Sequence, residues 1–274
     1  FEPPHFGPGA TVGGMVAAGL SGPARASVGA VRDYLLGVVL INGRAELLTF
    51  GGQVMKNVAG YDVSRLMAGA WGTLGLLTEV SLKVLPVAPA EATLHTWGGQ
   101  PLPLNASCWV EDAGVGQLYV RLRGAVAAVD AACKSMGGTR LDNATAAPDW
   151  QACREQTLPW FAARLARPGQ ALWRLSLPAT APVLALPGGV SPLVEWHGAL
   201  RWVQAPLAHG DVLREAARAV GGSASLFIAD GAVGERAGGQ LDLKSAALEQ
   251  IHARLKHSFD PAGIFNPGRM APQW

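Results

Sequence analysis

The segment at residues 10–22 has the composition of an anion-binding loop. Thr11 supplies a hydroxyl group, and Gly13 and Gly14 leave their backbone N–H groups uncovered by a Cβ atom. If a helix begins after Gly14, its first amides and its dipole add to the binding of an anion. Neither a GxGxxG fingerprint nor a Walker loop is present, so a tight turn leading into a buried helix of small residues is the simpler interpretation.

Two further segments combine turn residues with groups that can hydrogen-bond a ligand. Gly72 and Gly75 bracket a turn that opens a strand, and bare backbone there can lie against a ring system. Near the C-terminus, Asn266 stands between two Pro-containing turns (259–269) and can present both an acceptor and donors. The alternatives are an ordinary glycine turn between a helix and a strand, and a clamp that holds the last helix in place.

The composition indicates a protein with a large core. Of 274 residues, 49% are hydrophobic and 15% are charged, against ~25% charged in an average domain. The net charge of +2 gives no reason to expect nucleic-acid binding. Three cysteines without metal-site spacing argue against a disulfide scaffold and favour a reducing, cytoplasmic compartment. No apolar run approaches the ~18 residues of a membrane-spanning helix.

Elements that would position these residues can be assigned from hydrophobic patterns and turn signals, with a Pro-rich boundary near 86–91. Before the boundary, the patterns predict a strand over 31–41, a hairpin turn at 42–43, a returning strand over 45–50, a helix capped near Asp62, and a strand over 74–85. After it, they predict strands at 92–97, 116–123, 171–177, 193–203 and 223–229, and helices at 125–136, 149–156, 211–220 and 242–257. Because βαβ repeats are missing, we expect an α+β fold: an antiparallel sheet with helices on one side.

Several stretches together resemble a known flavoprotein family. They are the Thr-Val-Gly-Gly run of residues 11–23, the stretch 54–67 (VMKNVAGYDVSRLM) and the terminal FNPGR of residues 265–269, with 31–37, 50–52 and 72–75 in the expected order. The chain resembles the vanillyl-alcohol-oxidase type, or PCMH-type, FAD-binding flavoproteins, and among them the FAD-binding subunits of glycolate oxidase complexes. The match is near-continuous over 10–86, good in the last dozen residues, and loose between them.

The resemblance implies a fold, a cofactor and its binding residues. The fold would be a partial PCMH-type FAD-binding domain over 1–86, an antiparallel-sheet α+β cap domain over 87–257, and a C-terminal segment, 258–274, that returns to the flavin. The cofactor would be FAD, with main-chain amides and small residues holding its pyrophosphate. By this resemblance the cofactor-binding residues are Thr11, Gly13, Gly14, Gly19, Ser21, Gly22, Gly72, Gly75, Leu77 and Asn266.

Three features depart from the family pattern. The family's FAD domain begins with a smaller subdomain that carries its own pyrophosphate loop, and we expect that subdomain to be missing before Phe6. Trp71 stands where relatives often have an acidic residue ahead of Gly72. Relatives that oxidise D-2-hydroxy acids bind a divalent metal through a His-x-His pair, whereas the six histidines of this sequence contain no such pair, so we expect no metal site.

The candidates for catalysis are Glu195, His197 and Arg201. If they lie on one continuous strand, alternation places them on the same face. A base, a carboxylate that orients it and an arginine that binds a substrate carboxylate would suit the oxidation of a hydroxy acid. The alternative interpretation is the polar outer face of a half-buried sheet.

The resemblance implies an FAD-dependent oxidoreductase subunit of a glycolate oxidase-like complex, which oxidises a small 2-hydroxy acid to a 2-oxo acid. Its partners would be a catalytic flavoprotein subunit and an iron–sulfur subunit that takes the electrons, with activity only in the complex. The complex would be cytoplasmic, either free or attached peripherally to the inner membrane. The alternative hypothesis is a non-catalytic structural subunit that keeps the FAD fold as an assembly platform.

Overall fold

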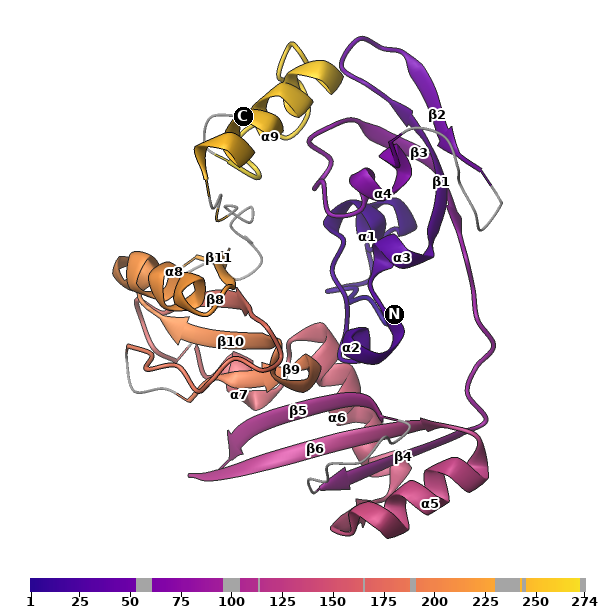
Figure 1. Cartoon of the computed structure of the whole chain (residues 1–274), viewed down its shortest axis with the longest axis vertical. Coiled ribbons are helices and arrows are strands. Elements are labelled where there is room, and N and C mark those ends of the chain that lie inside the picture. Colours follow the sequence, from indigo (N-terminus) through magenta and orange to yellow (C-terminus); the bar gives the residue numbers. More distant parts are fainter. Residues whose placement is uncertain are drawn as a thin grey trace. The chain divides into compact units, whose positions relative to one another are not determined.

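The computed structural model describes residues 1–52, 61–95, 104–112, 114–164, 166–187, 191–229, 242 and 245–271. The chain forms two compact units (Figure 1). The small-sheet unit comprises residues 3–21, 30–85 and 237–274, and the large-sheet unit comprises residues 1–2, 22–29 and 86–236. Residues 22–29 thus belong with the large sheet, and the last helix belongs with the small sheet rather than with residues 87–257. Among the described helices, none is both long and apolar enough to cross a membrane.

The small-sheet unit is built on three antiparallel strands in the order β2-β1-β3: β1 (Leu35–Ile41), β2 (Leu47–Gly51) and β3 (Leu76–Leu82). The predicted hairpin is confirmed, because Asn42 turns the chain by accepting the backbone N–H groups of Arg44 and Glu46. The strand predicted over 31–41 begins too early, because residues 31–34 form the short helix α3 (Val31–Tyr34). The Asp33 carboxylate accepts the Ala30 N–H at 2.8 Å and favours this helical turn.

Three further helices of this unit begin at side-chain caps. They are α1 (Val12–Ala18), α4 (Val63–Met67) and α9 (Ala246–Phe259). The predicted Asp62 cap is confirmed, because its carboxylate accepts the N–H of Arg65 at 3.0 Å. Thr11 and Ser245 cap α1 and α9 in the same way. The structure therefore starts α9 at a later residue than the expected 242.

The large-sheet unit contains an eight-stranded sheet in the order β11-β8-β10-β9-β5-β6-β4-β7, and its strand pairs are antiparallel. Its strands are β4 (Ala90–His95), β5 (Leu104–Asp112), β6 (Val115–Gly124), β7 (Thr139–Leu141), β8 (Ala171–Ser176), β9 (Leu193–Glu195), β10 (Leu200–Ala205) and β11 (Ser223–Ile228). The antiparallel α+β class is confirmed. The sequence patterns missed β5 and β7, and they merged β9 with β10.

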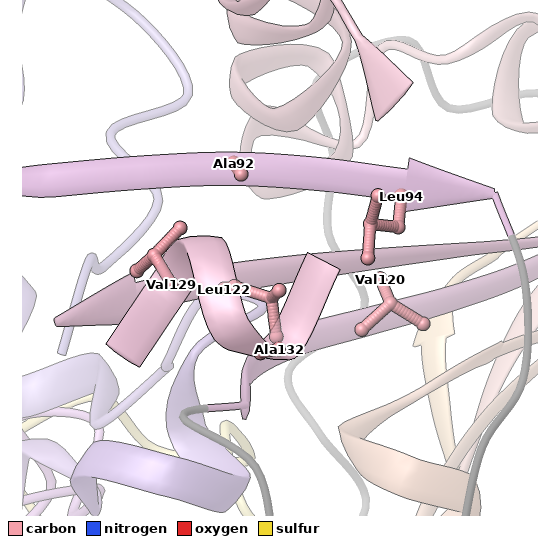
Figure 2. Packing of buried hydrophobic residues seen from close by; sticks show 6 residues of the cluster. All are labelled: Ala92, Leu94, Val120, Leu122, Val129 and Ala132. Atoms are coloured by element: carbon pink, nitrogen blue, oxygen red, sulfur yellow. The ribbon is translucent and has the colours of Figure 1, made fainter. Parts of the chain in front are cut away.

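Helices cover both faces of this sheet, not one face as expected. The unit's helices are α2 (Arg25–Val28), α5 (Val126–Met136), α6 (Asn143–Glu155), α7 (Pro159–Ala162) and α8 (Gly210–Ala219), with short 3-10 turns at Trp196–Gly198 and Leu207–His209. In Figure 2, Val129 and Ala132 of α5 lie against Leu94 and Leu122 of neighbouring strands. The adjacent residue Thr93 points to the other face, where its hydroxyl oxygen accepts the indole N–H of Trp150 from α6 at 2.9 Å.

Candidate functional site

The first turn of α1 is open toward solvent and has free backbone donors. Thr11, which is exposed, accepts the N–H of Gly14 at 3.0 Å through Oγ1 and the N–H of Met15 at 2.9 Å through its carbonyl oxygen. The N–H groups of Val12 and Gly13 have no acceptor among the described residues. A helix leaves its first amides unpaired unless a cap or a ligand takes them. This turn therefore combines a satisfied cap with two donors that an anion can use.

The other end of α1 crosses the turn after α4 at backbone contact. Gly19 has a φ of 61°, and a Cβ atom there would lie 2.6 Å from the backbone of Gly69. Hydrogen bonds from the N–H of Gly69 to the carbonyl of Val16, and from the N–H of Trp71 to that of Ala17, hold the two segments together. Packing alone therefore requires glycine at position 19, and a cofactor contact there stays a prediction.

The turn at 71–75 is held by the C-terminal segment of the same unit. Asn266 donates from Nδ2 to the carbonyl of Trp71 at 2.8 Å, and the guanidinium of Arg269 lies 5.0 Å from the centre of the Trp71 ring. A Cβ atom on Gly72 would lie 2.8 Å from the same Nδ2 atom. On Gly75 it would lie 2.7 Å from the carbonyl oxygen of Ile41 in β1. The structure thus brings Gly72 and Asn266 together, and it gives the segment the clamp role that we kept as the alternative.

A buried lysine, which the sequence analysis missed, anchors that clamp. Lys256 of α9 donates from Nζ to the carboxylate of Asp260 at 2.6 Å, and to the carbonyl oxygens of Thr73 and Phe265 at 2.7 and 2.8 Å. Asp260 also accepts the N–H groups of Ile264 and Phe265. The only signal in the sequence is the i, i+4 spacing of Lys256 and Asp260, which many exposed helical pairs share.

Three more predicted cofactor residues differ in their surroundings. The Ser21 hydroxyl oxygen is buried and has no hydrogen-bond partner in the described chain. The Leu77 carbonyl of β3 faces Gly13, where an added Cβ atom would lie 3.9 Å from it, an ordinary contact. Gly22 is part of the large-sheet unit, and a Cβ atom there would overlap the backbone of Glu2. Of the stretch 54–67, the most specific part of the resemblance, residues 54–60 lie outside the described residues.

These features fit the phosphate end of a dinucleotide. Thr11, Gly13, Gly14 and Leu77 come together at the first turn of α1, with two unused N–H donors. A buried hydroxyl without a partner, such as that of Ser21, costs free energy unless a ligand or water satisfies it. Gly13 and Gly14 keep that surface free of side chains, so a bulky anion can reach the amides.

The predicted catalytic strand in the large-sheet unit is interrupted. Trp196 and His197 have φ values of 53° and 55°, and Gly198 follows with a φ of 100°. A Cβ atom on Gly198 would lie 2.9 Å from the carbonyl of Ala179, so the tight turn depends on glycine there. The chain therefore leaves the extended conformation after Glu195. Strand alternation does not apply across this turn, and the predicted shared face of the three candidates is wrong.

Two of the three candidates are buried and form hydrogen bonds inside the unit. The alternative interpretation, a polar outer face of a half-buried sheet, is therefore also wrong for them. Glu195 accepts the thiol of Cys153 at 2.7 Å and the indole N–H of Trp202 at 3.0 Å, and burial raises the pKa of its carboxyl. Arg201 donates to the carbonyl oxygens of Ala181 and Pro182, both at 2.7 Å. Both side chains use their polar groups within the fold.

His197 is the third candidate, and hydroxyl groups orient its ring. Its Nδ1 lies 3.0 Å from the hydroxyl oxygen of Ser107, which also accepts the backbone N–H of His197 at 3.0 Å. The Ser107 hydroxyl can donate to Nδ1 or accept from it, depending on the tautomer of the ring, and Nε2 lies 3.4 Å from the Ser27 hydroxyl. Burial lowers the pKa of His197 from its ordinary value.

The residue before it, Trp196, lies against two guanidinium groups. Arg25 and Arg174 have their Cζ atoms 4.6 and 5.2 Å from the centre of its ring, and its indole N–H donates to the carbonyl of Gly22 at 3.0 Å. Burial and the neighbouring charge of Arg25 lower the pKa of Arg174 to about 10. The sequence carries no pattern that predicts this cluster, because its members come from three separate segments.

No group of three or more His, Cys, Asp or Glu side chains that could hold a metal ion occurs among the residues with described positions. The expectation of no metal site remains a prediction for the whole chain. The site that the described residues assemble is the α1 turn, and the interrupted strand of the large-sheet unit supplies a separate polar cluster of its own.

Comparisons with known proteins relate the chain to oxidoreductases. No protein-family model matches it. Glycolate oxidase subunit GlcE of Escherichia coli (strain K12) is 45% identical over 282 residues, covering 98% of this chain and 74% of that protein. A shorter match, 36% identical over 76 residues, covers 28% of this chain and 17% of the uncharacterized FAD-linked oxidoreductase Rv2280 of Mycobacterium tuberculosis (strain ATCC 25618 / H37Rv).

Among solved structures, an alkyldihydroxyacetonephosphate synthase matches with a TM-score of 0.59 at 15% identity, over 97% of this chain and 59% of that protein. This likeness concerns the fold alone and agrees with the α+β architecture described above. The identity to GlcE extends through both units. The chain therefore belongs to the GlcE family of glycolate oxidase subunits.

Proposed function

We propose that the chain is the FAD-binding subunit of a glycolate oxidase-type complex that oxidises a small 2-hydroxy acid. The observation that carries the proposal is the 45% identity to GlcE, which extends over 98% of the chain. The FAD-linked name of the mycobacterial relative and the resemblance to PCMH-type proteins support the cofactor. The free amides of Val12 and Gly13 support a binding site for its phosphates.

When bound, FAD would accept the hydride, with its two electrons, that leaves the carbon of the hydroxy acid, while the hydroxyl proton leaves separately. The chain's own residues bind and orient it. The α1 turn would donate backbone N–H groups to a phosphate, and the unpartnered Ser21 hydroxyl lies beyond the other end of the same helix. The clamp of Lys256, Asp260 and Asn266 holds the turn at 71–75 in one conformation. Less conformational entropy is therefore lost when the cofactor binds.

Partner subunits complete this proposal. The name of the E. coli relative is that of a subunit, so we expect this chain to pass electrons to another flavoprotein or to an iron–sulfur subunit. The carboxylate and the arginine of the predicted catalytic set, Glu195 and Arg201, are bonded within the fold and are therefore not available to the candidate base His197. Activity would then be measurable only in the complex.

A structural role is the second candidate function. It is favoured by the same finding that the side chains of Glu195 and Arg201 are bonded within the fold. If the described polar groups only stabilise the fold, the chain would serve as an assembly platform without bound flavin. The two candidates differ in one property, the visible absorbance of a flavin that remains on the protein.

The first experiment is an absorbance scan of the purified full-length protein after incubation with FAD and desalting. The flavin bands should remain at a near-stoichiometric ratio to protein. A Gly13→Ala variant should lose at least ten-fold in FAD affinity, because its methyl group would occupy the surface that the phosphate needs. Folding should not suffer, since that Cβ atom has room and alanine favours a helix by about 0.5–1 kcal/mol.

Gly9→Ala is the matched control. Gly9 precedes the same helix, a Cβ atom there meets nothing within 4 Å, and FAD affinity should stay within two-fold. Flavin retained equally by both variants would remove the α1 turn from the site. The unmodified protein is tested alone and with its partner subunits. If neither it nor either variant retains flavin, the redox role is excluded and the role of assembly platform is left.

A further inference from the structure

The large-sheet unit contains a cavity that the proposed flavin function does not use. It has a volume of about 410 Å³ and lies between the β5–β6 pair and the helices α6 and α7. Its lining residues all belong to that unit. Small-molecule sites in proteins have volumes of roughly 300–1,000 Å³, so this cavity has the size of a ligand site.

The cavity opens on the sheet face opposite the α5 core. In the β4–β6 register, Leu94 pairs with Val120 and Thr93 pairs with Arg121. Leu94 and Val120 lie in the cluster of Figure 2, whereas Thr93 lines the cavity. Because side chains alternate along a strand, the two sets of residues point to opposite faces. The cavity is thus a feature of the face that α6 covers, separate from the core under α5.

The walls of the cavity are aromatic and aliphatic. Trp150 of α6, Trp160 of α7 and Tyr119 of β6 contribute aromatic rings, and Leu141 and Leu158 add aliphatic surface. Buried polar groups of the lining are the Thr93 hydroxyl, which is 2% exposed, and the thiols of Cys108 and Cys153. The Thr93 hydroxyl accepts the N–H of Trp150, and its own proton has no acceptor among the described residues. Such a lining can hold an apolar body and offers one buried donor to it.

The rim of the cavity is acidic. Three exposed carboxylates line it, those of Glu111, Asp112 and Asp149, against one cation, Arg167. Asp112 and Asp149 both act on the phenol of Tyr119, whose pKa is raised first by burial and then by these two charges. Asp112, Asp149 and Tyr119 all line the cavity. No ion pair of Asp112 or Asp149 is present in the described part of the chain.

The arginine of the sheet that is packed beneath the cavity, Arg121, is already paired. The guanidinium of Arg121 lies 4.9 Å from the centre of the Trp150 ring, on an element beneath the cavity. It pairs with the carboxylate of Glu2 at 2.5 Å and with the side-chain oxygen of Asn105 at 2.7 Å. The excess of negative charge at the rim is therefore not cancelled from within the sheet.

We propose that this cavity binds a small organic cation: its ammonium group would be held by the rim carboxylates of Asp112 and Asp149, and its aromatic or branched apolar body would lie against Trp150 and Trp160. Charge attracts the ammonium group, and aromatic rings favour both the apolar body and a nearby cation. An anionic ligand would meet repulsion at the same rim. The proposal does not rest on flavin binding.

Titration calorimetry with three probes of similar shape tests whether the cavity prefers a positively charged ligand. The probes are 2-phenylethylamine, which is cationic at pH 7, the neutral 2-phenylethanol and the anionic 3-phenylpropionate. We expect the amine to bind about ten-fold more tightly than the alcohol, and the carboxylate to bind more weakly still. Added salt should weaken only the amine, because it screens exposed charges.

Variants locate the binding. Asp149→Asn should weaken the amine about three-fold, and the double variant Asp112→Asn/Asp149→Asn about ten-fold, with the alcohol unchanged. Asp130→Asn, an exposed carboxylate on α5 that pairs with Arg140, is the control and should leave every affinity within two-fold. Ala163→Leu, just after α7, should weaken all probes by filling the cavity, and Ala146→Leu, on α6, provides a second filling variant if the first fails to fold.

Equal affinity for amine, alcohol and carboxylate would overturn the charge selectivity. Amine binding that neither filling variant reduces, in protein shown to be folded, would place the ligand elsewhere. No heat of binding for any probe up to 10 mM would overturn the cavity as a ligand site. In each of these cases FAD retention can remain intact, so failure of this inference is distinguishable from failure of the proposed function.

Discussion

The ammonium group of Lys256 lies 2.6 Å from the carboxylate of Asp260, and both side chains are buried in the small-sheet unit. The pair closes one turn of α9 onto the segment that follows it. Lys256 also reaches the carbonyl of Thr73, and the N–H of Gly43 in the β1–β2 hairpin donates to the carbonyl of Phe259 at 2.8 Å. The ion pair therefore joins the end of α9 to the turn at Thr73, and the adjacent Phe259 carbonyl joins it to the β1–β2 hairpin.

Lys256→Met should destabilise the small-sheet unit by about 3–5 kcal/mol, because the Asp260 carboxylate would stay buried without its cation. Urea denaturation followed by circular dichroism measures the loss. Arg65→Met is the control: Arg65 pairs with Asp62 on the surface of the same unit, and such pairs contribute about 0–1 kcal/mol. Equal stability of the two variants would show that the pair is not needed.

Gly19→Ala should cost about 2–4 kcal/mol in the free energy of unfolding. The left-handed backbone costs about 1–2 kcal/mol with a side chain present, and the methyl group would overlap the backbone of Gly69. The same urea series gives the value. Gly9→Ala, in open space, should change the stability by less than about 0.5 kcal/mol. A tolerated alanine at position 19 would contradict the close crossing of α1 and the 68–71 turn.

Glu195→Gln should keep the fold and the activity of the assembled complex, because a glutamine oxygen can still accept the indole N–H of Trp202. Glu195→Leu should destabilise the large-sheet unit by about 1–3 kcal/mol, since it leaves that N–H buried and unpaired. Thermal unfolding and glycolate-dependent dye reduction are the two measurements. A hundred-fold loss of activity in the folded Glu195→Gln variant would show instead that the carboxylate acts in catalysis.

His197 should titrate below 6.5, because burial lowers its pKa. A depressed pKa means that the unfolded chain takes up the proton first. This group therefore contributes stability above pH 6.5 that is lost as the pH falls through the folded pKa. The ring proton signal of His197 in a two-dimensional NMR titration gives the pKa directly.

His197→Asn should reduce the loss of stability on acidification below pH 6.5, since asparagine tolerates the left-handed backbone and does not titrate. A His197 signal that titrates at or above 6.5 would contradict the burial. Stability that falls with pH identically in the variant would assign the pH dependence to other groups.

The sequence alone determined the features that depend on neighbouring residues. Asn42 turns the β1–β2 hairpin and Asp62 caps α4 through bonds to residues two to four positions away, so their side-chain chemistry was enough to predict them. The antiparallel α+β class followed from the order of strand and helix patterns, and the resemblance of residues 10–86 and 265–269 predicted the family. In each case the informative contacts or motifs are local in the chain.

Features that depend on contacts between distant residues became visible only in the folded structure. Strand alternation predicted one face for Glu195, His197 and Arg201, but a left-handed turn at 196–198 breaks the strand, and only glycine fits beside Ala179 at position 198. The same is true of Lys256, whose carbonyl acceptor Thr73 is 183 residues away. The cavity between β5, α6 and α7 likewise exists only when a strand that the patterns missed pairs with β6. Such contacts leave no periodic signal, because the residues that form them are adjacent only after the chain has folded.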